Sequence, residues 1–227
     1  MNERLGRLLV IEGLDGSGKA TQTQLLQESL TARGFACRKI SFPDYQHKSS
    51  TLVQMYLAGE IGSLEQVNVY AASSFYAADR YISYATDWQK DYLAGRTVLA
   101  DRYVTSNAAH QMSRLPREQW EEYLSWMEEY EYKRLGLPRP DLVLYLDMCP
   151  AVSRLLLEKR YGGDESRRDI HERNAAYLEK SRGAALFAAQ QLGWQVIPCD
   201  DGAQPFSPGM IQERILAFLE NKVLDRQ

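Results

Sequence analysis

Short apolar runs alternate along the chain with longer stretches in which apolar residues recur at helical spacing. The runs predict strands at 8–11, 36–42, 97–100, 142–146 and 194–198. Three of these runs lack the apolar–polar alternation of a strand with one solvated face. This is typical of parallel strands that are buried on both faces.

The stretches between the runs have the pattern of helices. They predict helices at about 20–33, 64–94, 103–135, 150–160, 170–192 and 208–224. A repeated order of strand, helix and strand predicts an open parallel sheet covered by helices on both faces, which is a three-layer α/β sandwich. A length of 227 residues favours one domain over 1–227.

Composition narrows the class of protein. Apolar residues make up 44% of the chain and the net charge is −3, which argues against a protein that depends on non-specific nucleic-acid binding. No run approaches the ~18 apolar residues of a membrane span. The three cysteines, Cys37, Cys149 and Cys199, are few and widely spaced. They favour buried thiols in a reducing compartment over a disulfide framework or a zinc site, and so predict a cytoplasmic protein.

A glycine-rich loop follows the first predicted strand and matches G-x-x-x-x-G-K. It consists of Gly13, Leu14, Asp15, Gly16, Ser17, Gly18 and Lys19, followed by Ala20 and Thr21. In such a phosphate loop the backbone N–H groups and the next helix N-terminus face phosphate oxygens, and the lysine reaches the β- and γ-phosphates. A turn that binds nothing is the alternative. The required order of strand, loop and helix favours an ATP site.

The position after the lysine departs from the strict motif. A serine or threonine hydroxyl normally ligates Mg²⁺ there, and this chain has Ala20. Thr21 follows, but on a helix it points about 100° away. Because Mg²⁺ usually keeps several waters, we expect it to be held through water, phosphates and carboxylates elsewhere.

Further polar residues indicate a second ligand beside ATP. Asp101 and Arg102 follow the third predicted strand, where open α/β sheets bind ligands. Asp101 suits water-mediated Mg²⁺ contact or orientation of an acceptor oxygen, and Arg102 suits bidentate phosphate binding. Tyr76 and Arg80 share one face of a predicted helix. Taken alone, such a pair is more often a surface contact.

Together these residues resemble the thymidylate kinase (dTMP kinase) family. The matching stretches are 12–22, 42–45, 75–80, 101–107, 144–147 and 169–172, in family order over nearly the whole chain. The resemblance implies a P-loop nucleoside monophosphate kinase that transfers the γ-phosphoryl group of ATP to dTMP, with Mg²⁺ as cofactor. It also implies a homodimer with a mobile lid.

The resemblance also implies roles for individual residues. The acceptor would be bound by Asp15, Phe42, Tyr45, Phe75, Tyr76, Arg80, Arg102, Ser106, Asn107 and His110. Among these, Tyr76 is favoured over Phe75 for stacking on thymine, and Asn107 would bind the base edge. Asp15 and Asp101 would lie at the metal.

A lid is expected at 159–170. Gly16 follows Asp15, so the phosphate loop offers no arginine, and the basic residues of 159–170 resemble the lid of bacterial-type members. Arg160 and Arg167 would then join Lys19, Asp15, Arg102 and Asp101 in catalysis. An arginine that closes on the transferring phosphoryl group can be worth ~10³–10⁵ in rate. A solvated loop is the alternative, because charged runs usually are solvated.

Two other functions stay open from the sequence. The acceptor of a kinase could be another nucleoside monophosphate or a deoxynucleoside. A nucleoside hydroxyl would need a carboxylate base, whereas Arg102 and Tyr45 favour a phosphate. A P-loop NTPase that transfers nothing is the other candidate, but the chain has no Asn-Lys-x-Asp guanine motif.

Overall fold

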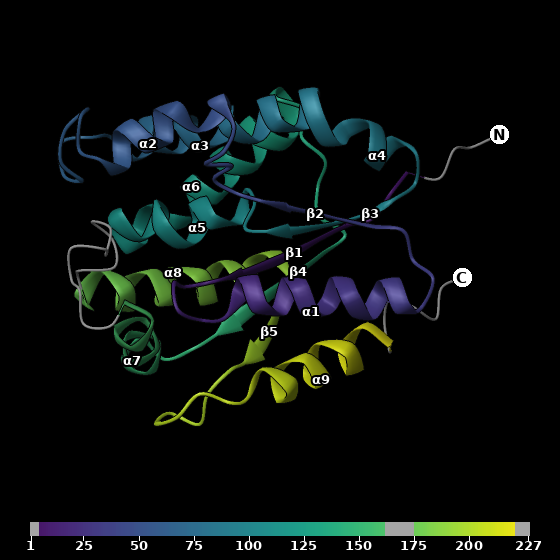
Figure 1. Cartoon of the computed structure of the whole chain (residues 1–227). Coiled ribbons are helices and arrows are strands. Elements are labelled where there is room, and N and C mark those ends of the chain that lie inside the picture. The colour runs from purple at the N-terminus through teal and green to yellow at the C-terminus, as the bar shows by residue number, and fades with distance from the viewer. Residues whose placement is uncertain (1–4, 162–174, 221–227) are drawn as a thin grey trace.

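A computed structural model describes residues 5–161 and 175–220, and five parallel strands in this part of the chain form one sheet (Figure 1). The strands are β1 (Leu8–Gly13), β2 (Cys37–Ser41), β3 (Thr97–Asp101), β4 (Leu142–Asp147) and β5 (Gln195–Pro198), in the order β2-β3-β1-β4-β5. All five predicted strands are confirmed, with ends shifted by one or two residues. β1, which leads into the phosphate loop, lies at the centre.

Both faces of the sheet are buried under helices. In β1, Leu8 and Val10 pack into one apolar cluster, and Leu9 and Ile11 pack into another on the opposite face. The first face is covered by α3 (Val69–Ser83), α5 (Thr105–His110), α6 (Trp120–Met127) and α8 (Ala175–Leu192), and the second by α1 (Lys19–Ala32) and α9 (Pro208–Leu219) (Figure 1). This confirms the three-layer sandwich and explains why three of the predicted strands lack apolar–polar alternation.

Two of the predicted helices are interrupted. The segment 103–135 is not one helix, because Pro116 separates α5 and a 3₁₀ turn from α6, and a proline interrupts helical hydrogen bonding. A π-helical segment, Glu128–Arg134, then follows α6. The segment 64–94 becomes α3, a π-helical turn at Tyr84–Trp88 and α4 (Gln89–Leu93). The Asn68 side chain caps the start of α3.

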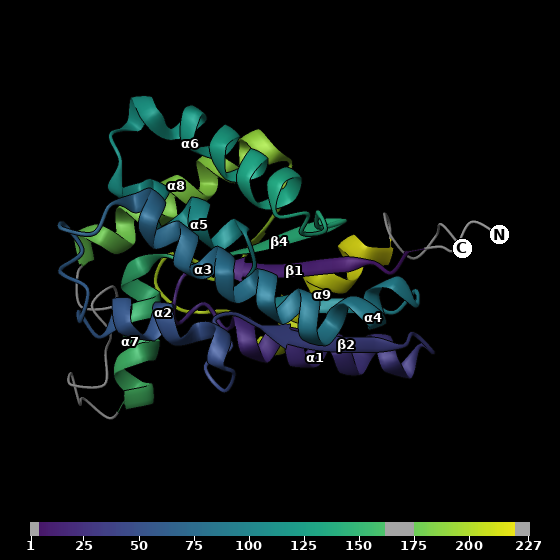
Figure 2. The same cartoon turned by 90° about the horizontal axis from the view of Figure 1, so that it is seen from above.

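The α-helix α2 (Thr51–Leu57) was not predicted from the pattern. With α7 (Pro150–Tyr161), it lies at the end of the sheet where the strands finish (Figure 1 and Figure 2). Only the backbone at the start of the predicted lid is described, as the last turn of α7. The side chains of Arg160 and Arg167 lie outside the described residues.

The carboxyl ends of three strands meet at one edge of the sheet. In the strand register, Asp101 pairs with Ile11 on one side and with Ser41 on the other. The backbone N–H of Arg102 donates to the carbonyl of Ile11 over 3.1 Å, and that of Phe42 donates to the carbonyl of Asp101 over 3.0 Å. The parallel pairing thus brings the phosphate loop and the ends of β2 and β3 together.

The three cysteines are free thiols. Cys199 is buried, as predicted, but the prediction of burial is wrong for Cys37 and Cys149, which are only partly buried. Among the described residues, no helix has the length and apolar character needed to cross a lipid bilayer. The cytoplasmic location stays a prediction.

Candidate active site

The phosphate loop curls tightly between β1 and α1. Gly16 and Gly18 have φ angles of 82° and 87°, in the left-handed region that glycine adopts readily. A Cβ atom on Gly16 would lie 2.7 Å from the carbonyl oxygen of Ser153, so the loop has no room for a side chain there. No described side chain caps α1, and its first turn holds no acidic residue. The N-terminus of α1 is therefore suited to an incoming anion.

Lys19 lies buried at the bottom of this loop. Its Nζ donates to the carbonyl of Leu14 over 2.8 Å and lies 3.6 Å from Oδ1 of Asp15. Burial lowers the pKa of Lys19, and the positive charge of Arg102 lowers it further. Asp15 balances only part of the positive charge of Lys19 and Arg102, so the binding of negatively charged phosphate groups is favoured here.

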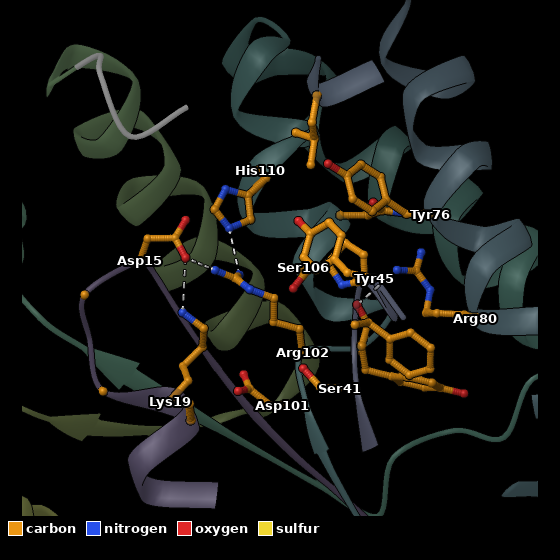
Figure 3. A pocket seen from close by; sticks show the side chains of 18 of the residues that line it. Asp15, Lys19, Ser41, Tyr45, Tyr76, Arg80, Asp101, Arg102, Ser106 and His110 are labelled. Carbon is orange, nitrogen blue, oxygen red and sulfur yellow. Dashed lines mark hydrogen bonds and ion pairs between the residues drawn. The ribbon is translucent and has the colours of Figure 1, made fainter. Parts of the chain in front are cut away.

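Arg102 joins the phosphate loop to the neighbouring strand end (Figure 3). Its NH2 donates to Oδ1 of Asp15, and its NH1 donates to Nε2 of His110 over 3.0 Å and approaches Oε1 of Glu12 at 3.4 Å. Burial alone raises the pKa of Asp15, but the positive charges of Arg102 and Lys19 outweigh it, and that pKa lies well below its usual range. Arg102 itself has a φ of 69°, which is uncommon for a residue with a side chain.

Glu12 supports this arrangement from beneath, and the sequence did not predict it as a site residue. Its carboxylate is fully buried and accepts hydrogen bonds from Thr105 Oγ1 at 2.9 Å, Ser106 Oγ at 2.7 Å and the Gly13 N–H at 3.1 Å. An acidic residue near the end of an apolar strand was the available signal. Ser106, which was predicted to bind the phosphoryl acceptor, is therefore also hydrogen-bonded to the residue that precedes the phosphate loop.

An open cavity of about 720 Å³ runs from the phosphate loop to the aromatic residues of α3. That volume suits small-molecule ligands. Its lining includes Asp15, Gly16, Gly18, Lys19, Ala20, Thr21, Phe42, Tyr45, Tyr76, Arg80, Asp101, Arg102, Ser106, Asn107 and His110. Figure 3 shows Asp15 and Lys19 at one end, Tyr76, Tyr45 and Arg80 at the other, and Arg102 between them. Fifteen predicted site residues thus share one cavity.

Four other predicted residues are not among the described residues that line the cavity. Gly13, Leu14 and Ser17 belong to the phosphate loop but are buried on its side away from the cavity. Ser17 Oγ has no hydrogen-bond partner in the described part of the chain. Phe75 packs against Tyr56, with ring centroids 6.2 Å apart, whereas its neighbour Tyr76 lines the cavity. Of the two aromatic residues, only Tyr76 is placed to meet a ligand there.

The structure also shows what holds Arg80, which was predicted as a residue that binds the acceptor. Its guanidinium forms a double hydrogen bond with Glu131, over 2.7 and 2.6 Å, and both side chains are 1% exposed. Glu131 was not predicted as a site residue. It lies four residues after Met127 and eight after Tyr123, both buried, so a charged residue on an apolar helical face was the signal.

Carboxylates near the phosphate loop could assist a divalent cation. Asp101 and Asp15 both line the cavity and offer the oxygen ligands that Mg²⁺ prefers, but Asp15 already binds Arg102. Ala20 has no ligating side chain, and the exposed Thr21 lies on the cavity wall. No group of three or more His, Cys, Asp or Glu within the described ranges could enclose a metal ion. These donors suit a cation that keeps waters and phosphate oxygens as ligands.

A phosphate loop that shares one cavity with an aromatic and arginine-lined compartment defines a P-loop phosphotransferase with a separate place for its acceptor. The family model for thymidylate kinase matches residues 11–203. The chain belongs to the thymidylate kinase family.

Individual relatives agree with this assignment. The chain is 36% identical over 204 residues to the thymidylate kinase of Mycobacterium tuberculosis, covering 85% of this chain and 92% of the relative. It is 29% identical over 239 residues to that of Caenorhabditis elegans, covering 100% and 94%. A solved thymidylate kinase structure from Candida albicans superposes with a TM-score of 0.70 at 21% identity, covering 96% and 92%, and supports the fold.

Proposed function

We propose that this chain transfers the γ-phosphoryl group of ATP to dTMP, giving ADP and dTDP, and so supplies a precursor of dTTP. Membership of the thymidylate kinase family supports the reaction. The observation that carries it in the structure is Arg102, which bonds to Asp15 of the phosphate loop and lines the cavity between the loop and the aromatic end.

The chemistry needs positioning more than a base. The phosphate of dTMP is already ionised near neutral pH, so its oxygen can attack the γ-phosphorus in line with the leaving ADP oxygen. Lys19 and the N-terminus of α1 stabilise the negative charge of ATP, and Arg102 orients the acceptor phosphate by exchanging its bonds to Asp15 and His110. A bound Mg²⁺ would neutralise charge on the β- and γ-phosphates, with Asp101 holding it through water.

A panel of acceptors tests this function. ADP release should be fastest with dTMP among dTMP, dUMP, UMP, dCMP, dGMP and AMP. Omission of the acceptor should leave only slow ATP hydrolysis. A poor rate with dTMP beside a high rate with another monophosphate would refute the acceptor. Hydrolysis that no monophosphate accelerates would favour an NTPase that transfers nothing.

A second experiment tests the residue that assists the metal. Asp101→Asn should raise the Mg²⁺ concentration needed for half-maximal rate by about 10–100-fold, the range found when outer ligands of a metal site are removed. Thr21→Ala is the comparison, since Thr21 also lines the cavity, and it should leave the Mg²⁺ requirement unchanged. The opposite result, with Thr21→Ala impaired and Asp101→Asn normal, would give the role to Thr21.

Two further parts of the proposed function concern the lid side chains, which lie outside the described residues, and a second copy of the chain. Arg160 and Arg167 would supply positive charge to the transferring phosphoryl group from the lid. Two copies would form a homodimer, which sedimentation of the purified protein would detect. Both parts derive from the family resemblance.

A further inference from the structure

Three buried polar side chains form one network at the aromatic end of the cavity. Arg80 comes from α3, Asn107 from α5 and Glu131 from the π-helical segment after α6, and each is at most 2% exposed. Arg80 and Asn107 line the cavity, and Glu131 is not among the described residues that do. Glu131 can therefore act on a ligand only through the other two.

Glu131 fixes the guanidinium of Arg80. Nε donates to Oε2 over 2.7 Å and NH2 donates to Oε1 over 2.6 Å, which sets the plane of the group. NH1 has a 3.4 Å contact with the carbonyl of Tyr103. A guanidinium carries five N–H donors, so donors remain for a ligand. Glu131 balances the charge of Arg80. The remaining N–H donors of Arg80 therefore suit a neutral hydrogen-bond acceptor of the ligand better than a phosphate.

The same carboxylate fixes the amide of Asn107. Its Nδ2 donates to Oε1 of Glu131 over 2.9 Å and to the carbonyl of Ser73 over 3.4 Å. An ionised carboxylate only accepts hydrogen bonds, so the amide nitrogen has to face Glu131. The other end of the amide, Oδ1, is a hydrogen-bond acceptor. Asn107 therefore offers an acceptor to the cavity, beside the donors of Arg80.

We propose that Glu131 is a positioning residue that sets which base edge the cavity accepts. An acceptor at Asn107 beside a donor at Arg80 matches a base that presents a ring N–H next to a carbonyl oxygen, as thymine and uracil do. Cytosine presents a ring acceptor next to an amino donor, so both contacts would be mispaired. A buried mispaired group costs about 1–3 kcal/mol. This inference rests on the proposed function, because it assumes a pyrimidine monophosphate as acceptor.

The test compares dTMP with 5-methyl-dCMP, which keeps the methyl group and changes only the edge. Binding of each to the full-length protein is measured by calorimetry. Wild-type protein should bind dTMP at least about tenfold more tightly, the size of one mispaired buried hydrogen bond. In Glu131→Gln the new amide can pair with either end of the Asn107 amide, so the preference should shrink at least severalfold. ATP affinity should stay the same.

Glu129→Gln is the matched control. Glu129 lies in the same π-helical segment but pairs near the surface with Lys133 and Arg134, so the preference should stay at the wild-type value. Equal weakening of both ligands in Glu131→Gln, or a lower melting temperature with the preference intact, would make Glu131 purely structural and overturn the proposal.

The wild-type measurement keeps the inference testable if Glu131→Gln fails to fold. Equal affinity of wild-type protein for dTMP and 5-methyl-dCMP would overturn edge recognition without any variant. The role of Glu131 and the proposed function can also fail separately. If dTMP is phosphorylated but the preference is absent, only the role of Glu131 fails. If no monophosphate is phosphorylated, the proposed function fails with it.

Discussion

Lys19→Ala should lower kcat by about 10²–10³-fold, the usual cost of removing one preorganised group that stabilises the transition state. The structure gives the reason: Lys19 Nζ is buried in the phosphate loop within 2.8 Å of the Leu14 carbonyl and close to Asp15. Water cannot replace a charge at that place with equal effect. ATP affinity should also fall, and dTMP affinity should change little. Steady-state ADP release and calorimetric titration with each nucleotide measure these effects.

Lys39→Ala is the control for the loss of one positive charge. Lys39 lies on β2, is exposed, and bonds to Gln24 on the surface. Its removal should leave both kcat and ATP affinity at wild-type values. If Lys19→Ala weakened dTMP binding as strongly as ATP binding, the assignment of Lys19 to the donor nucleotide would be wrong.

The sheet could be predicted from sequence because burial on both faces leaves a local mark. The strands β1, β3 and β4 are short apolar runs, and residues such as Leu8 and Leu9 face opposite clusters. The helices were harder to place. Pro116 breaks what looks like one long amphipathic stretch, and two π-helical segments shift the register of side chains beyond any fixed period.

The residues of the candidate site likewise fall into those that local sequence predicts and those that only the fold brings together. The phosphate loop is local, since glycine conformations and the start of α1 follow from consecutive residues. Tyr76 and Arg102 could be assigned from the family resemblance, and both line the cavity. Glu12 and Glu131 could not be assigned, because the side chains that bond to them are 24 to 94 residues away in the chain. Only the fold brings such carboxylates beneath the residues that meet the ligand.

Arg102→Ala should lower kcat/KM for dTMP by about 10³-fold, within the range reported for arginines at transferring phosphoryl groups. Arg102 is positioned by Asp15 and His110, so that its fork can turn to an acceptor phosphate without leaving the cavity. The loss should appear mainly as weaker dTMP binding and slower transfer, with ATP affinity near the wild-type value. Rates at varied dTMP and at varied ATP separate the two effects.

Arg102→Lys distinguishes lost charge from lost geometry. Lysine keeps the positive charge beside the buried Glu12, so the melting temperature should fall less than in Arg102→Ala. A single ammonium cannot reproduce the bidentate fork, and kcat/KM for dTMP should still fall by roughly 10-fold or more. If either variant lost ATP affinity as Lys19→Ala does while dTMP affinity stayed normal, Arg102 would belong to the donor side. The link between the phosphate loop and the acceptor would then need another residue.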